Sequence, residues 1–279
     1  MKVFLSEREI EIEAGLRLFE FRARTQPDAD VVVYNGAPAA TDRELREGDR
    51  VVLIRRGEIP GAGELEALMM ARHTPGVHAR VKTATVGIAG VGGLGSAVAV
   101  ALARTGVGCL VLADFDVVEP SNLNRQQYFV DQIGFLKVDA LAANLARINP
   151  YVKVVAHGVR LTSANIPELF ADVDVMIEAF DAAEAKAMLL GSFGKAFPST
   201  PIVMASGLAG YGPGETLRVR KLGPRVYVVG DLESDARPGR GLMAPRVGIA
   251  AHLEANAALR LLLGEEPGIA NDQIANDEG

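Results

Sequence analysis

The stretch TATVGIAGVGGLGSAVAVALARTGVGCLVLADFD, residues 83–116, has the pattern of a buried strand, a glycine-rich turn, an alanine-rich helix and a second strand. Gly90, Gly92 and Gly95 fit G-x-G-x-x-G between the first strand and the helix. The first glycine permits a tight turn, the second lets a phosphate approach the backbone, and the third lets the helix lie close to the strand. The helix N-terminus offers unpaired N–H groups to an anion. The stretch therefore predicts a nucleotide site.

An acidic residue follows at the spacing expected of a ribose ligand. Asp114 ends the second predicted strand, about twenty residues after the glycine turn. An NAD-dependent oxidoreductase needs only an ordinary loop after this acid, whereas this chain adds five polar side chains. They are Asn122, Asn124, Arg125, Gln126 and Lys137. Because Arg and Lys neutralise phosphate charge, the group favours phosphoryl or nucleotidyl transfer over hydride transfer. Arg125 as a partner of a carboxylate and Lys137 on a solvated helix face are the structural alternatives.

The remainder of the chain after residue 84 alternates predicted strands with predicted helices. This order indicates an α/β fold with a doubly wound, mostly parallel sheet. Residues 215–223 and 225–231 have the pattern of an antiparallel pair at its end, followed by a loop at 237–248 and a helix at 249–264.

A second acidic residue follows another predicted buried strand, DVMIEAFD, residues 174–181. This strand carries Asp181 to the carboxyl edge of the sheet, where open α/β sheets bind ligands. Mg²⁺ prefers one or two carboxylates together with substrate phosphates. Asp181 is therefore a candidate magnesium ligand. The alternative is that it caps the next helix, and one side chain could do both.

The first sixty residues predict a separate small unit. Their element order is β-β-α-β-β, which is typical of a β-grasp, or ubiquitin-like, domain. A Gly- and Pro-rich segment, GEIPGAGELEA, then leads into a helix. The predicted divisions are a β-grasp domain at 1–58, a linker with a helix at 59–82, the nucleotide domain at 83–266 and a disordered tail at 267–279.

Composition excludes several classes of protein. Of the 279 residues, 49% are hydrophobic and 23% are charged, as in a globular protein with a real core. The net charge of −6 disfavours nucleic acid as a partner. We expect no membrane span and no signal peptide, and hence a cytoplasmic protein. Cys109 is the only cysteine, which excludes an intramolecular disulfide and predicts an inert thiol in a buried strand, with no Lys, Arg or His within three residues.

Several motifs together resemble the ThiF/MoeB adenylating enzymes, the bacterial relatives of ubiquitin-activating enzymes. These motifs are GVGGLG at 90–95, LADFDVVEPSNLNRQ at 112–126, a Lys that opens the next helix, EAFDAAEAK at 178–186 and GLMAPRVGIAAHLEANAALRLLLG at 241–264. The resemblance extends from about residue 64 to residue 264. It implies a Rossmann-like sheet, ATP and Mg²⁺ as cofactors, and a homodimer. The implied reaction is adenylation of the C-terminal glycine carboxylate of a ubiquitin-like sulfur carrier protein, with release of pyrophosphate.

The resemblance also implies roles for individual residues. Arg125, Lys137 and Asp181 would be catalytic, with Asp181 holding Mg²⁺. The implied nucleotide-binding residues are Gly90, Gly92, Gly93, Gly95, Asp114, Ser121, Asn122, Asn124, Arg125, Gln126 and Lys137. An arginine that reaches across a dimer is typical of the family, and Arg72 is the best-placed candidate, although a solvated arginine at a helix end fits equally well.

The chain departs from the family in its cysteines. There are no paired C-x-x-C motifs, so we expect no structural zinc. Relatives that form a thioester or persulfide carry a Cys between Asp181 and the C-terminal hairpin, and this chain has none there. Its chemistry is therefore predicted to stop at the acyl-adenylate.

The N-terminal unit resembles the ThiS/MoaD sulfur carriers but continues into the enzyme through EIPGAGELEA, so a docking or regulatory role is predicted for it. This likeness favours a thiamine-pathway carrier as the substrate. The alternatives are a molybdopterin-pathway carrier, a tRNA-modifying enzyme of the same fold, an NAD-dependent oxidoreductase and a scaffold with a relic nucleotide site.

Overall fold

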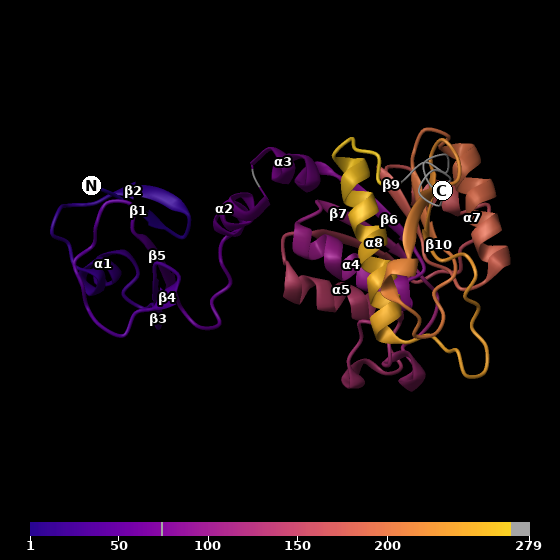
Figure 1. Cartoon of the computed structure of the whole chain (residues 1–279), viewed down its shortest axis with the longest axis horizontal. Coiled ribbons are helices and arrows are strands. Elements are labelled where there is room, and N and C mark those ends of the chain that lie inside the picture. The colour runs from indigo at the N-terminus through magenta and orange to yellow at the C-terminus, as the bar shows by residue number, and fades with distance from the viewer. Residues whose placement is uncertain (74, 269–279) are drawn as a thin grey trace, which may run out of the picture. The chain divides into compact units, whose positions relative to one another are not determined.

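The computed structural model describes residues 1–73 and 75–268, without the side chains of residues 71, 72 and 75 (Figure 1). Contacts divide the chain into two units, one spanning Met1–His78 and the other beginning at Ala79. This division falls inside the segment predicted as a linker. The predicted tail lies outside the described residues from position 269 on, and the side chain of Arg72 lies outside them as well.

The N-terminal unit is a five-stranded sheet with one helix packed on it. Its sheet has the order β2-β1-β5-β3-β4, with β1 and β5 parallel and the other pairs antiparallel. Val3, Leu18, Phe21 and Val51 form part of its buried core. The elements are β1 (Lys2–Leu5), β2 (Arg8–Glu11), α1 (Leu18–Thr25), β3 (Val31–Tyr34), β4 (Ala37–Pro38), β5 (Arg50–Ile54) and α2 (Ala62–His73). The predicted β-grasp order is confirmed, with the two-residue strand β4 as an addition.

The second unit contains a seven-stranded sheet with helices on both faces. The strand order is β11-β12-β10-β9-β6-β7-β8, and every pair is parallel except β11 with β12. Its strands are β6 (Thr85–Ala89), β7 (Cys109–Ala113), β8 (Lys153–His157), β9 (Val175–Glu178), β10 (Ile202–Ala205), β11 (Arg218–Lys221) and β12 (Val226–Gly230). The predicted doubly wound sheet with an antiparallel end is confirmed.

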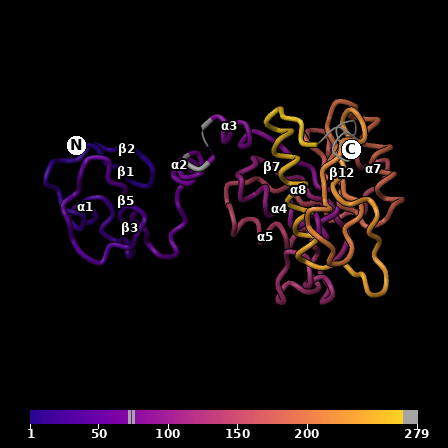
Figure 2. The backbone as a smooth tube through the Cα atoms, viewed as in Figure 1, coloured from indigo at the N-terminus to yellow at the C-terminus, as the bar shows by residue number. Residues whose placement is uncertain are grey.

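Helices cover the two faces of this sheet. They are α4 (Gly93–Thr105), α5 (Lys137–Ile148), α6 (Ile166–Leu169), α7 (Ala183–Ala196) and α8 (Ala244–Leu262), with short 3-10 turns η1 (Pro120–Asn122), η2 (Val130–Gln132) and η3 (Gly214–Thr216). The division between the two units falls within α3 (Pro75–Thr83). Helix α4 packs against α5 and α8 (Figure 2). Helix α6 packs against α7. On the α6 and α7 face, Phe170, Met176 and Phe193 are fully buried in one apolar cluster.

The order of the strands reverses beside β6. The chain moves from β6 to β7 on one side, and later returns to β9 on the other side. In open α/β sheets, ligands bind at the carboxyl ends of the strands where the order reverses in this way. The glycine turn follows β6 and Asp181 follows β9, so both predicted ligand-binding segments lie at this position.

Helix α8 begins earlier than the sequence pattern indicates. We expected a loop to residue 248, but α8 starts at Ala244 with Pro245 in its first turn, where a proline loses no hydrogen bond. Arg246 is therefore a helical residue, and it is only 4% exposed. Within the described ranges, no helix, α8 included, is both long and apolar enough to cross a membrane.

Candidate nucleotide site

The glycine turn has the backbone geometry that its sequence predicts. Gly90 has a φ of +87°, a region that disfavours side chains, and its N–H donates to the carbonyl of Ala113 at 2.9 Å. A methyl group at Gly95 would lie 2.0 Å from the Gly90 carbonyl oxygen, so only glycine lets α4 come this close to β6. Gly92 is the N-cap of α4 and supplies no capping side chain. The first N–H groups of α4 therefore remain available to an anion.

Asp114 is held against this turn by two backbone groups. One carboxylate oxygen accepts the N–H of Val91 at 2.8 Å, and the other accepts the N–H of Asp116 at 2.9 Å. Asp114 lies just after β7, beside the strand that carries the glycines. Its carboxylate is thus fixed next to the turn before any ligand arrives. Its binding to a ribose stays a prediction.

Arg125 and Gln126 lie over the glycines. A methyl group at Gly93 would be 3.3 Å from Cγ of Arg125, and one at Gly92 would be 3.8 Å from Nε2 of Gln126. Gln126 is buried, and its Oε1 has no hydrogen-bond partner in the part of the chain that the structure describes. Because an unpaired buried amide is costly, this side chain fits a bound ligand. An amide can offer a donor to a phosphate and an acceptor to a sugar hydroxyl.

Two of the predicted ligands support the polypeptide of this loop. The side-chain oxygen of Asn122 accepts the N–H of Glu119 at 3.0 Å, which closes the η1 turn. The hydroxyl of Ser121 donates to the carboxylate of Glu119 at 3.3 Å. Asn122 is buried and Ser121 is exposed. Their contacts to a nucleotide stay predictions.

Asn124 joins this loop to the segment that precedes α8. Its amide nitrogen donates to the carbonyl of Leu242 at 3.1 Å, and its amide oxygen accepts from Arg125 at 2.8 Å. The guanidinium of Arg125 is therefore oriented by its neighbour. Arg125 binds no carboxylate in the described ranges, so the structure does not support the alternative that Arg125 is the partner of a carboxylate.

Lys137 is buried, so a position on a solvated helix face is wrong. It is the first residue of α5 and is 6% exposed. Its ammonium donates to the carboxylate of Asp116 at 2.9 Å, and its backbone N–H donates to the Asp116 carbonyl at 2.9 Å. Asp116, which the sequence analysis missed, thus links Lys137 to Asp114. The sequence signal for Asp116 was its position as the second aspartate of DFD, residues 114–116.

Asp181 stands at the carboxyl edge of the sheet with a free side chain. The N-cap of α7 is Ala182, so the alternative that Asp181 caps this helix is wrong. Asp181 is exposed, and its carboxylate makes no hydrogen bond or ion pair with any described residue. An exposed carboxylate near the glycine turn fits the ligand set that Mg²⁺ prefers.

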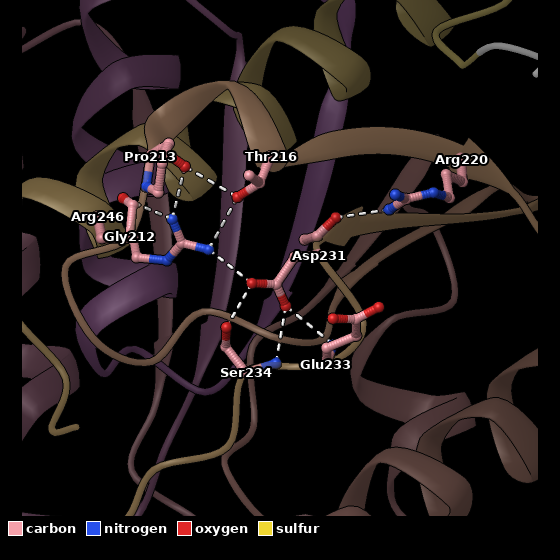
Figure 3. Close-up of polar contacts among 9 residues, drawn as sticks. Gly212, Pro213, Thr216, Arg220, Asp231, Glu233, Ser234 and Arg246 are labelled. Carbon is pink, nitrogen blue, oxygen red and sulfur yellow. Dashed lines mark hydrogen bonds and ion pairs between the residues drawn. The ribbon is translucent and has the colours of Figure 1, made fainter. Parts of the chain in front are cut away.

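A buried ion pair joins α8 to the loops that follow β10 and β12, as Figure 3 shows. The guanidinium of Arg246 donates to the carboxylate of Asp231 at 2.6 Å. It also donates to the carbonyls of Gly212 and Pro213, both at 2.9 Å, and to the hydroxyl of Thr216 at 3.2 Å. The Arg246 side chain therefore connects two loops to the first turn of α8. Arg246 lies four residues after Leu242, whose carbonyl accepts from Asn124.

Asp231 is ionised within this network. Burial opposes its charge, but hydrogen bonds from the Ser234 hydroxyl, the N–H groups of Glu233 and Ser234, and Arg246 lower its pKa to about 2 (Figure 3). The sequence pattern singled out neither residue, because it placed Arg246 in the loop at 237–248 and Asp231 at the end of the predicted strand at 225–231. No local signal identifies this pair, because a long loop separates the end of β12 from the start of α8.

Glu254, on α8, is a further buried group without a signal in the sequence. It is fully buried, and neither carboxylate oxygen has a hydrogen-bond partner within residues 1–73 and 75–268. Burial, together with the negative charge of Glu178, raises its pKa well above the usual value of 4.5. Glu254 therefore carries a proton in the folded protein at pH values where an exposed glutamate is charged.

Glu254→Gln is expected to raise the free energy of unfolding at pH 8 and to leave it nearly unchanged at pH 4. Stability from a group with a raised pKa is fully present below its unfolded pKa, and it is lost as the pH rises toward the folded pKa. The loss is about 1.4 kcal/mol for each pH unit in this window. Gln has no charge to bury, so urea unfolding should show a flatter pH profile. Glu184→Gln, at an exposed position of α7, is the control, and equal stability of Glu254→Gln and the parent at pH 8 would contradict the expectation.

Cys109 is half-buried at the start of β7, rather than fully buried as expected. Burial raises the pKa of its thiol, and Lys153 opposes this shift. Lys153 is paired with Cys109 in the sheet register, so a cation lies closer than the sequence neighbours indicated. The pKa of the Cys109 thiol is still raised overall, which disfavours the thiolate.

The fold and the site define a protein of the doubly wound α/β class, with a glycine-rich turn after its central strand. Within that class the chain belongs to the ThiF family, which it matches over residues 66–278. Residues 1–57 match the ThiS-like ubiquitin family. Both the fold of the second unit and the β-grasp unit predicted from the sequence agree with these matches.

Two similar proteins are known in eukaryotes. The chain is 32% identical over 209 residues to the adenylyltransferase and sulfurtransferase UBA4 of Eremothecium gossypii, covering 70% of this chain and 46% of that protein. It is 32% identical over 190 residues to ubiquitin-like modifier-activating enzyme 5 of Drosophila sechellia, covering 63% of this chain and 45% of that one. The chain thus spans less than half the length of these curated relatives.

Solved structures share the fold. The tRNA N6-threonylcarbamoyladenosine dehydratase TcdA of E. coli, solved in complex with ATP, matches with a TM-score of 0.66 and 22% identity, over 80% of this chain and 100% of that chain. The E. coli protein MccB, solved with AMPCPP and MccA, matches with a TM-score of 0.53 and 24% identity, over 68% of this chain and 59% of that chain.

Proposed function

We propose that this chain is an ATP-dependent adenylyltransferase that activates the C-terminal glycine carboxylate of a ubiquitin-like sulfur carrier protein. A carboxylate oxygen of the carrier attacks the α-phosphorus of ATP. The bond from that phosphorus to the oxygen bridging toward the β-phosphorus breaks, and pyrophosphate leaves with the electron pair. The product is an acyl-adenylate on the carrier.

The observation that carries this proposal is the placement of two cations and an amide beside one glycine turn. Arg125 and Gln126 lie over Gly92 and Gly93, and Lys137 is tied through Asp116 to the acid next to that turn. In the proposed reaction, Arg125 and Lys137 stabilise negative charge as pyrophosphate departs, and they need little rearrangement because the protein already orients them. A hydride carrier would make no use of this charge.

The nature of the carrier is argued from the N-terminal unit and from the family. A ThiS-like ubiquitin domain at residues 1–57 favours a carrier of the ThiS type, and hence thiamine biosynthesis. One relative is named for adenylyl transfer and sulfur transfer together, but this chain spans only 46% of it. The chain has a single cysteine, in the sheet, so we propose that it forms the adenylate and that sulfur comes from another protein.

Cys109→Ala is expected to leave adenylate formation and carrier activation nearly unchanged. The thiol is half-buried, and its raised pKa keeps it protonated at neutral pH. Pyrophosphate release with a carrier measures the first step, and denaturing electrophoresis without reductant detects a covalent carrier adduct. An adduct that yields to reductant and disappears in Cys109→Ala would overturn the adenylate-only chemistry.

Asp181 is proposed to hold Mg²⁺, which when bound would neutralise charge on the ATP phosphates. Asp181→Asn is expected to raise the Mg²⁺ concentration needed for half-maximal pyrophosphate release about tenfold or more, with partial rescue at high Mg²⁺. The midpoint of thermal unfolding should stay unchanged, because the side chain makes no hydrogen bond or ion pair within the described residues. A lowered midpoint with a normal Mg²⁺ requirement would mean that the residue is structural.

We propose a homodimer, as in the family that the chain resembles. The loop between β7 and α5 supports it, because this loop exposes large apolar side chains, and such a patch is typical of an interface. They are Phe115, Val117, Phe129, Val130, Ile133, Phe135 and Leu136. Analytical ultracentrifugation tests the proposal, and a monomer at micromolar concentration would contradict it.

The overall function is tested by pyrophosphate release with ATP and purified carriers of the ThiS and MoaD types. A carrier lacking its terminal glycine is the control and should release none. Release with a MoaD-type carrier alone would move the enzyme to the molybdopterin pathway. Release with tRNA would favour the tRNA-modifying alternative, which the net charge of −6 disfavours. Tight binding of NAD with no binding of ATP and Mg²⁺, measured by calorimetry, would refute adenylation.

A further inference from the structure

The turn that carries Asp181 is anchored on its sheet side by its own backbone. The N–H of Ala179 donates to the carbonyl of Ala89 at 2.9 Å, at the end of β6. The N–H of Phe180 donates to the carboxylate of Glu178 at 2.7 Å. These bonds hold the first half of the turn beside the glycine turn, but they do not hold the half that leads into α7.

Lys186 supplies the missing attachment from α7. Its ammonium lies 3.0 and 2.9 Å from the two carboxylate oxygens of Glu178, and 3.1 Å from the carbonyl of Ala205 at the end of β10. Glu178 is fully buried, and the Lys186 side chain is 20% exposed. The Lys186 ammonium therefore connects α7 to the carboxyl ends of β9 and β10. The turn that carries Asp181 lies between β9 and α7, so this connection joins its two ends.

The neighbouring carboxyl group does not compete for this ammonium. Glu254, from α8, is buried close enough to Glu178 and Lys186 to interact with both charges, yet its oxygens accept no hydrogen bond within the described residues. Its raised pKa keeps it neutral. Among the described residues, Lys186 thus has a single charged partner, and the three hydrogen bonds that it makes with them all connect the helix to the two strands.

We propose that Lys186 is a positioning residue for the carboxylate of Asp181, because it closes the turn between β9 and α7 at the edge of the sheet. The Asp181 side chain makes no hydrogen bond or ion pair in the described part of the chain, so its position depends on the backbone of this turn. The proposal rests on the proposed magnesium role of Asp181. It adds a requirement that the turn be rigid before the metal and the nucleotide bind.

The test uses the double variant Glu178→Gln/Lys186→Met in the full chain. Lys186→Met alone would leave a buried charge unpaired and could prevent folding, whereas the double variant removes both charges. Mn²⁺ binding, in the presence of a non-hydrolysable ATP analogue, is measured by electron paramagnetic resonance. Hydrogen exchange of the amides at 179–183 is measured in the ligand-free protein. Lys195→Met, at an exposed position of α7, is the matched control.

We expect the double variant to bind Mn²⁺ at least tenfold more weakly and to exchange the amides at 179–183 at least tenfold faster, with the control unchanged in both. Normal Mn²⁺ affinity and normal exchange in the folded double variant would overturn the positioning role, even if Asp181→Asn weakens Mn²⁺ binding. Normal Mn²⁺ affinity in Asp181→Asn would instead refute the metal role of Asp181, and the positioning role with it.

Discussion

Arg125→Ala and Lys137→Ala should each lower the rate of carrier adenylation by about 10²-fold or more, which corresponds to about 3 kcal/mol of transition-state stabilisation. Arg125 lies over Gly93 and is oriented by Asn124, and Lys137 is buried and paired with Asp116. Both charges are thus held in place before the pyrophosphate group leaves. The measurement is ATP–pyrophosphate exchange with a saturating carrier.

Two controls separate this effect from a general loss of charge. Arg104 is exposed in the last turn of α4, at the opposite end of the helix from the glycine turn, and Lys195 is exposed near the end of α7. Arg104→Ala and Lys195→Ala should retain full exchange. Because the losses arise in the chemical step, they should appear mainly in kcat. Exchange that survives both Arg125→Ala and Lys137→Ala would refute the assignment of the catalytic site.

Arg246→Met is expected to destabilise the second unit by about 3–5 kcal/mol, the cost of leaving one member of a buried ion pair unpaired. The variant loses the bond to Asp231 and the bonds to the Gly212 and Pro213 carbonyls. The midpoint of thermal unfolding should fall on the order of 10 °C. Arg225→Met, at an exposed position before β12, is the control and should change it little.

The double variant Asp231→Asn/Arg246→Met should recover part of this loss, since it no longer buries an unpaired carboxylate. The pH profile gives a second measurement. The pKa of Asp231 is lowered to about 2, so its stabilising contribution is present above its usual value of 3.8 and is lost as the pH falls through 2. Arg246→Met should reduce this loss at acid pH. An unchanged thermal midpoint in Arg246→Met would show that the network does not stabilise the fold.

The catalytic candidates could be proposed from the sequence because they lie in short motifs. The glycines and Asp114 fall within one strand–helix–strand segment, and Lys137 opens the helix that follows the next loop. The positions of these residues depend on local structure, because short turns and helix N-termini determine where their backbone and side-chain groups lie. The same locality explains why Asp116, only two residues after Asp114, was within reach of the sequence and was overlooked.

The contacts between segments that are distant in the sequence could not be predicted. Lys186 meets Glu178 and the Ala205 carbonyl, and Glu254 comes close to both charges from α8. No pattern along the chain indicates which charged residue will be buried against another. The same holds for Cys109, whose neighbour Lys153 approaches through the pairing of β7 with β8.

The sequence by itself determined the order of strands and helices, the glycine turn and the residue types at the strand ends, because hydrophobic periodicity and backbone conformation act over short distances along the chain. Tertiary structure decided which of these groups are held rigid. It placed the buried pairs Arg246 with Asp231 and Lys186 with Glu178, which join segments from different strands and helices. The physical reason is that a charge can be buried only where the fold brings an opposite charge and hydrogen-bond partners to it, and that arrangement exists only after the layers have packed.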